Sequence, residues 1–337
     1  MKSGRGGSTG HSFLACCSGT RDIMTMTELR NHKFIFLCGL HRSGTTPLFR
    51  ILRSHPQISG FANTGVPEDE GQHLQTVYPP AGQFGGPGQF GFAAAAHLTE
   101  GSGLCTPANA ERLFQQWSPH WNLNREFLVE KSPPNLVRTR FLQACFPDSY
   151  FITIIRHPIA VSLATLKWSR SRIKSLLEHW LVCHRLFDAD CEHLQRVLVI
   201  RYEDLISGPE LVLDQVRVFL GLGSPMAGKL DRNGNERYFA VWRQFQKSAD
   251  GQVVTSDLAE KYESSFRDYC YSLRDCSVLF PSERVPSRSI HSYRNNSSTE
   301  RAQSGASSVG PPGARRSAEG RALSVNRCIN STAIEEG

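Results

Sequence analysis

Residues 34–56 constrain the fold of this chain more than any other stretch. An apolar run, FIFLCGL, contains Gly39, and five residues after Gly39 come Gly44 and the pair Thr45-Thr46. Apolar residues at helical spacing follow, so the pattern predicts a strand, a tight loop and a helix. Glycines let a loop turn tightly, and backbone N–H groups at the start of a helix attract an anion. We therefore predict a phosphate-binding loop over residues 39–46.

The spacing is close to that of the loop of nucleoside triphosphatases, GxxxxGK[ST], but it departs from it in one respect. Thr45 stands where that pattern has a lysine, and the cation of this loop comes earlier, at Arg42. The missing lysine argues against hydrolysis of ATP or GTP. A P-loop kinase for a small molecule stays open as an alternative, and it would need a Mg²⁺-binding acid after a strand.

Further apolar runs alternate with helical patterns along the chain. EFLVEK, SYFITII and RVLVIRY are predicted strands that end near Lys131, Arg156 and Arg201. We expect helices over 93–101, 171–193 and 257–274, and a long Gly/Pro-rich loop after the first helix. Such alternation predicts an α/β fold with three layers, in which helices flank a central parallel sheet. Ligands of such sheets bind beyond the carboxyl ends of the strands, so Lys131, Arg156 and the loop should converge on one crevice.

Composition sets the limits of the domain. The chain has 337 residues and a formal net charge of +7, much of it from arginines near the C-terminus. We expect a disordered leader at 1–30, one domain at 31–280 and a disordered tail rich in Ser, Arg and Gly at 281–337. The modest charge does not indicate nucleic-acid binding. No apolar stretch reaches the length of a membrane span, and the oligomeric state cannot be read from the sequence.

The cysteines give an expectation about the compartment. Ten cysteines are present, without a CxxC pair or zinc-finger spacing, and Cys38 falls in a predicted core strand. This favours thiols in a reducing compartment, so we expect a cytoplasmic protein. Residues 1–30 lack an adequate secretory apolar region, while an organellar transit peptide there stays open.

Four segments in order resemble one family. GLHRSGTTPLFRIL is similar to the 5′-phosphosulfate loop of sulfotransferases that use 3′-phosphoadenosine 5′-phosphosulfate (PAPS). The Arg-Ser-Gly-Thr-Thr core is closest to the branch of tyrosylprotein, glycan and many microbial sulfotransferases. EKSPPN, IIRHPIAVS and RYEDLISGP also resemble family segments. The resemblance covers roughly residues 33–275 and implies the sulfotransferase fold, related to P-loop nucleoside triphosphatases.

The resemblance and the chemistry together suggest the catalytic residues. Arg42 stays charged at any working pH and can stabilise the bridging oxygen, and Lys131 suits the sulfate oxygens. An acceptor alcohol needs a base, and family members of this branch use a Glu shortly after the first helix. Here the segment PEDEGQHL supplies several candidates, from which we choose Glu70 and keep His73 in reserve. Cations and amides can neutralise the charge of the transfer, so we expect no metal.

The resemblance also implies a nucleotide site. The loop contributes Arg42, Ser43, Gly44, Thr45 and Thr46, and Arg156 can fork onto the 3′-phosphate. The family places a serine eight residues after this arginine, but position 164 is Ala. Ser162 or Thr165 could supply the hydroxyl, and we favour Ser162. Tyr202 matches a tyrosine near the adenine.

Three readings of the function follow. The first is a sulfotransferase that moves a sulfuryl group from PAPS to a hydroxyl or amine, the second is the small-molecule kinase, and the third is an inactive homologue that binds PAP or PAPS. The acceptor, a glycan, a peptide tyrosine or a small alcohol, cannot be identified from the sequence. The loop over 60–97 is expected to shape its pocket.

Overall fold

The computed structural model describes residues 31–277, so the expected leader at 1–30 and tail at 281–337 lie outside the described residues. Within this range a sheet of five parallel strands has the order β2-β3-β1-β4-β5. The predicted three-layer α/β fold is confirmed. The strands are β1 (Lys33–Cys38), β2 (Ile58–Gly60), β3 (Phe127–Lys131), β4 (Ser149–Ile155) and β5 (Val197–Arg201).

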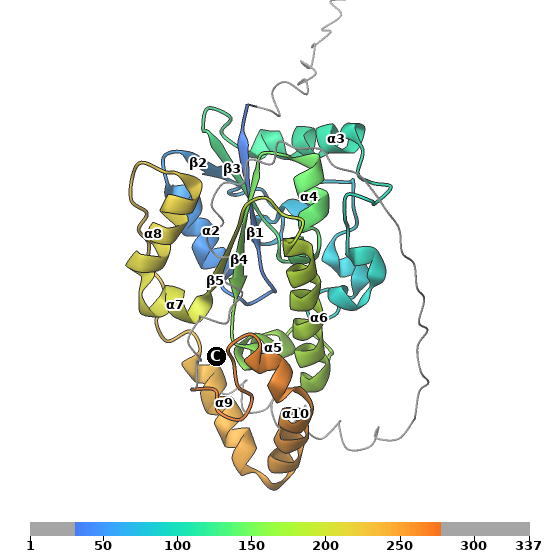
Figure 1. The fold of residues 1–337 in the computed structure, drawn as a ribbon, viewed down its shortest axis with the longest axis vertical. Coiled ribbons are helices and arrows are strands. Elements are labelled where there is room, and N and C mark those ends of the chain that lie inside the picture. Colours follow the sequence, from blue (N-terminus) through green and yellow to red (C-terminus); the bar gives the residue numbers. More distant parts are fainter. Residues whose placement is uncertain (1–30, 278–337) are drawn as a thin grey trace, which may run out of the picture.

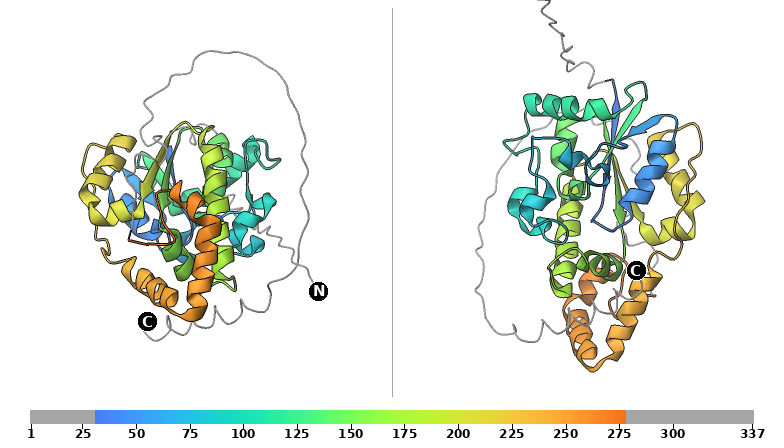
Figure 2. Two further views of the ribbon diagram at one scale, coloured as in Figure 1. Left: turned by 60° about the horizontal axis from the view of Figure 1, so that its bottom comes forward. Right: turned by 180° about the vertical axis from the view of Figure 1, so that it is seen from behind.

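Helices cover both faces of this sheet (Figure 1). On one face lie α2 (Thr45–Ser54) and α8 (Pro209–Leu220), and on the other lie α3 (Pro107–Trp117), α4 (Thr139–Cys145) and α6 (Ile173–Cys191). The views in Figure 2 show the same two layers on opposite sides of the sheet. The helices α5 (Pro158–Leu166), α9 (Glu236–Lys247) and α10 (Ala249–Arg267) gather beyond the carboxyl ends of the strands, and the short α7 (Tyr202–Ser207) follows β5 directly.

Strand β1 lies at the centre because its side chains suit burial on both faces. Residues 34–38 are all buried, as a strand between two helical layers requires. The chain places β2 and β3 on one side of β1 and then crosses to β4 and β5 on the other. The carboxyl end of β1 is therefore the point where the strand order reverses, which is where such sheets bind ligands.

Two predicted helices differ from the structure. The helix expected over 93–101 is only a single 3₁₀ turn, Ala94–Ala96. The residues that follow this turn contact parts of the chain that are distant in sequence. The His97 ring hydrogen-bonds the buried Asp190 carboxylate, and the amide of Leu98 donates to the carbonyl oxygen of Val137. The helix expected over 257–274 begins earlier and ends earlier, as α10. In α10, Ser248 caps the start by accepting from the amide of Gly251.

The Gly/Pro-rich segment after α2 is a chain of 3₁₀ turns, the last of which packs against α6. These turns are Pro67–Asp69, Gly71–His73, Ala81–Phe84 and Phe90–Phe92. Phe90 is fully buried, and Gly91 lies so close to α6 that a Cβ atom there would come 2.2 Å from Sγ of Cys183. The amide of Gly91 donates to Nε2 of His179 on the same helix. Because residue 91 is glycine, this part of the segment can pack directly against α6.

This close approach gives the first prediction. We expect Gly91→Ala to destabilise the protein by about 1–3 kcal/mol, because the added methyl group must displace the Cys183 side chain or the segment itself. Urea unfolding of the full chain measures the change. Gly82→Ala is the matched control, since no atom lies within 4 Å of a Cβ there. Equal stability of the two variants would contradict the contact.

Candidate active site

The loop after β1 has the backbone conformation that an anion cradle needs. Gly39, Arg42 and Gly44 all have positive φ values of 147°, 69° and 97°. A Cβ atom at Gly39 would lie 2.7 Å from the carbonyl oxygen of Ile154, so the turn requires glycine there. Helix α2 begins at Thr45 without a side-chain cap. Its first amides are therefore free of a side-chain partner at the positive end of the helix dipole.

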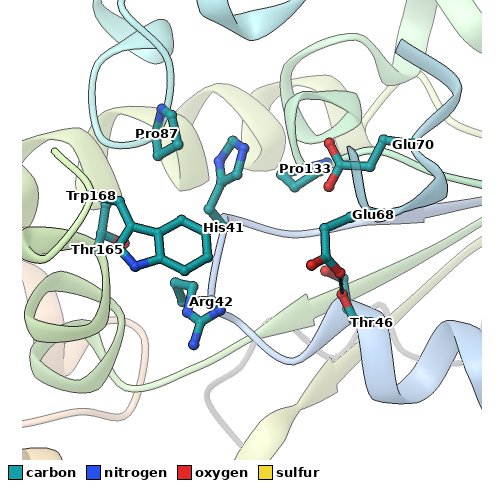
Figure 3. Close-up of a pocket in the computed structure, with 10 residues that line it drawn as sticks. His41, Arg42, Thr46, Glu68, Glu70, Pro87, Pro133, Thr165 and Trp168 are labelled. Carbon is teal, nitrogen blue, oxygen red and sulfur yellow. Dashed lines mark hydrogen bonds between the residues drawn. The ribbon is translucent and has the colours of Figure 1, made fainter. Parts of the chain in front are cut away.

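A pocket opens directly in front of this helix (Figure 3). It encloses about 470 Å³ of empty space, part of which is open to solvent. One wall carries Arg42 and Trp168, and the opposite wall carries Glu68 and Glu70. The pocket is lined by residues of the phosphate loop, of the 3₁₀ segment, of the turn after β3 and of the end of α5. These residues are His41, Arg42, Thr45, Thr46, Glu68, Glu70, Pro87, Pro133, Thr165 and Trp168.

Arg42 is an exposed cation at the mouth of this pocket. Its guanidinium lies 5.0 Å over the ring of Trp168, which is itself 66% exposed. Among residues 31–277 no carboxylate forms an ion pair with Arg42. The stacking orients the guanidinium without neutralising its charge. Arg42 therefore remains available to an anionic ligand.

Lys131 and Glu70 form a buried ion pair beside the loop. Nζ of Lys131 lies 3.1 Å from Oε1 of Glu70 and also donates to the carbonyl oxygen of Glu68 at 3.0 Å. Lys131 is fully buried, and Glu70 is 6% exposed. Gln72 donates to the other carboxylate oxygen of Glu70, and His73 lies 4.0 Å from it. The predicted base, its reserve and the predicted lysine are thus brought together.

Glu130, which the sequence analysis did not single out, anchors the segment that carries Glu70. Its Oε1 accepts from the amide of Gly71 at 2.9 Å and from the hydroxyl of Ser132 at 2.5 Å. Asn135 donates to its other oxygen. Burial raises the pKa of Glu130 to about 7. Its position directly before Lys131, inside a buried strand, was the signal that could have marked it.

His41 is a second residue that the sequence analysis missed. It lines the pocket, and its buried Nδ1 has no hydrogen-bond partner among the described residues. Burial lowers the pKa of His41 to about 3, and the charges of Lys131 and Arg42 act in the same direction. The imidazole is therefore neutral at pH 7, so it can accept a hydrogen bond within the loop region.

Arg156 joins the carboxyl end of β4 to the phosphate loop. Its Nη1 donates to the carbonyl oxygen of Arg42 at 2.7 Å, which places the two predicted anion-binding elements next to each other. Its Nε donates to Oδ1 of Asn235, and its Nη2 donates to the carbonyl oxygen of Gly234. The guanidinium lies 4.2 Å over the ring of Tyr202. Arg156 and Tyr202 therefore lie beside the phosphate loop, although neither of them lines the pocket of Arg42.

The remaining predicted residues differ in their access to the pocket. Thr45, Thr46 and Thr165 line it. The hydroxyl of Ser43 is buried and has no partner among residues 31–277, and its amide donates to the carbonyl oxygen of Leu40 at 3.0 Å. The hydroxyl of Ser162 is also buried, and it faces a smaller cavity beside His41 instead of the pocket of Arg42. This placement favours Thr165 over Ser162 as a ligand of the pocket.

The chain matches the model of the Sulfotransferase family over residues 35–225, more than half of its length. It therefore belongs to the sulfotransferase family, and this membership supports sulfotransferase activity. The matched range contains the phosphate loop, Lys131, Arg156 and Tyr202.

Solved sulfotransferases are similar to the chain at low identity. A Mycobacterium tuberculosis sulfotransferase is 15% identical, with 63% of this chain and 72% of that chain covered and a TM-score of 0.41. One from Alicyclobacillus acidocaldarius is 16% identical, with 63% and 92% covered and a TM-score of 0.37. A mouse sulfotransferase complexed with PAP is 14% identical, with 66% and 72% covered and a TM-score of 0.32.

A search of curated protein sequences gave no significant match. Among the helices between residues 31 and 277, none has both the length and the apolarity to cross a membrane.

The buried Glu130 carboxyl gives a prediction about pH. Its pKa in the folded chain, about 7, lies above the ordinary value of 4.5. Between these pH values the folded state keeps a proton that the unfolded chain has lost, so the stability from Glu130 is complete below pH 4.5 and is lost as the pH rises toward 7. The free energy of unfolding should fall by a few kcal/mol over this pH range, since a difference of one in pKa corresponds to about 1.4 kcal/mol.

Glu130→Gln should remove this part of the pH dependence. A neutral amide imitates the protonated carboxyl, and rotation of the Asn135 amide would turn its partnerless Oδ1 toward the new donor. Urea unfolding between pH 4.5 and 8 measures the difference between the wild-type chain and the variant. Glu260→Gln, at an exposed position of α10, serves as the control. A difference that stays constant with pH would contradict the raised pKa.

Proposed function

We propose that the chain transfers a sulfuryl group from PAPS to a hydroxyl or amine of an acceptor by in-line displacement, and that residues 31–280 form the domain that does so. The acceptor oxygen or nitrogen attacks sulfur while the bond between sulfur and the 5′-phosphate oxygen breaks. The electron pair of that bond stays on the phosphate, which leaves as PAP. The proton of the acceptor passes to a base of the protein.

One observation carries this proposal. The hydrogen bond from Arg156 to the carbonyl oxygen of Arg42 unites the loop after β1 with the cation after β4. A nucleotide with phosphates at its 5′ and 3′ positions needs two such anion sites close together. Family membership of the chain supports the same donor.

The residues divide into donor and transfer roles. We assign the 5′-phosphosulfate to the amides of Gly44–Thr46 with the hydroxyls of Thr45 and Thr46. The 3′-phosphate is assigned to the remaining N–H groups of Arg156 and to Thr165, with Ser162 as the weaker candidate, and the adenine is assigned to the side of Tyr202. Arg42 and Lys131 neutralise the charge that develops on the bridging and sulfuryl oxygens, so the proposed reaction uses no metal.

Glu70 is the proposed base. Its carboxylate lines the pocket and is held by Lys131 and Gln72, which fixes its direction. A buried ion pair contributes little to stability on balance, because desolvation of both charges offsets their attraction. The pair of Lys131 and Glu70 is thus better explained by a role in the transfer of sulfate and proton than by a role in folding.

The donor can be tested by binding. Calorimetric titration with PAP, in the presence and absence of Mg²⁺, should give the same affinity in both conditions. Binding that requires Mg²⁺, or that prefers ATP, would support the small-molecule kinase instead. PAP binding without transfer of labelled sulfate from PAPS to a panel of glycans, tyrosine peptides and small alcohols would support the inactive homologue.

Replacing Arg42 tests the charge stabilisation. Arg42→Ala should abolish measurable transfer of labelled sulfate, a loss of at least about 10²–10³-fold as for other oxyanion donors. Arg50→Ala is the matched control, because Arg50 is an exposed arginine on α2. Unchanged turnover of Arg42→Ala would remove Arg42 from the mechanism.

Replacing Glu70 tests the base. Glu70→Gln keeps an oxygen for Lys131 but cannot take a proton, so kcat should fall about 10²–10⁴-fold while PAP binding is preserved. His73→Gln is the companion variant. A large fall of kcat in His73→Gln together with normal turnover in Glu70→Gln would transfer the role to His73.

A further inference from the structure

The mouth of the phosphate loop is already engaged by a carboxylate of the chain itself. The hydroxyl of Thr46 donates to Oε2 of Glu68 at 3.3 Å, and Glu68 belongs to the opposite wall of the pocket. Figure 3 shows the two side chains directed toward each other across the start of α2. The start of a helix attracts negative charge, so the carboxylate lies where an anionic ligand is expected.

The backbone that presents Glu68 is strained. Glu68 and Asp69 are consecutive residues with φ values of 53° and 50°, a left-handed conformation that side chains other than glycine rarely adopt. Such strain persists only where the surroundings hold it, and it concentrates at sites of ligand binding. The contacts of this turn must therefore stabilise its left-handed conformation.

Contacts on both sides hold the turn in place. Oδ1 of Asp69 accepts from the amide and the hydroxyl of Thr64, and Arg53 lies 3.7 Å from its other oxygen. Lys131 donates to the carbonyl oxygen of Glu68 and to the carboxylate of Glu70. Through the backbone of one residue, the turn links the phosphate loop to the pair of Lys131 and Glu70.

We propose that the Glu68 carboxylate is a gate of the donor site, an inference that rests on the proposed function. Its carboxylate competes with the phosphosulfate for Thr46, and the phosphosulfate displaces it because two anions repel each other at the same helix start. The carboxylate then turns away while Lys131 keeps its hold on the Glu68 carbonyl oxygen and on Glu70. Donor binding thus releases one contact of the turn and leaves the transfer residues in place.

Glu68 is exposed, so a substitution there should leave the fold intact. Glu68→Gln keeps a hydrogen-bond acceptor for Thr46 but removes the charge, and Glu68→Ala removes both. We expect PAP to bind about 5- to 10-fold more tightly to each variant than to the wild-type full chain, the size of one charge repulsion in bulk water, because the exposed carboxylate is solvated. The gain should shrink as salt rises from 20 to 500 mM, because salt screens exposed charges.

Calorimetric titration with PAP measures these affinities, and Glu111→Gln is the matched control. Glu111 lies on α3, beside the amino ends of the strands, and the change alters net charge equally. An affinity gain in both Glu68 variants but not in Glu111→Gln supports the gate. Unchanged or weaker binding in the Glu68 variants overturns the gate alone. Absence of PAP binding in the wild-type chain and all variants overturns the proposed function, and the gate with it.

Discussion

The hydrogen bond between the Arg156 guanidinium and the carbonyl oxygen of Arg42 is the constraint on which the site depends. It connects the ends of two neighbouring strands, β1 and β4, and it holds Arg42, the residue of the phosphate loop with a left-handed backbone conformation. Asn235 and Tyr202 hold the same guanidinium from other directions. Because the cation is 7% exposed, its direction is set by these partners and not by solvent. The Arg156 guanidinium is therefore held firmly against the loop after β1.

The opposite side of the crevice is organised by two adjacent residues of β3. Glu130 holds Gly71, and Lys131 holds Glu70, so adjacent residues of one strand control adjacent residues of one turn. Successive side chains of a strand point to opposite faces, yet both of these side chains contact the turn that carries Glu70. Contacts with β3 thus fix the direction of Glu70, the proposed base.

The sequence was sufficient for the sheet, for the strand, tight loop and helix around residues 39–46, and for the places of Lys131 and Arg156 at the carboxyl ends of their strands. Each of these depends on local signals: an apolar run, glycines at fixed spacing, and the rule that parallel strands end together. The helix expected over 93–101 was wrong, because His97 is bound to Asp190, a partner that local preference cannot reveal. The same limit explains why Glu130 and His41 were missed. Their importance comes from burial and from neighbours distant in sequence, and the burial of the Ser162 hydroxyl could not be read from helical spacing.

One wall of the pocket is formed by the segment that packs against α6. It consists of short 3₁₀ turns seated by Gly88 and Gly91, and it contributes Pro87 to the pocket without contributing a strand to the sheet. Changes in its length or side chains would leave the parallel ladder and the nucleotide cradle intact. Under the proposed function, remodelling of this wall would change which acceptor fits the pocket, while the loop and the arginine that we assign to the donor stay the same.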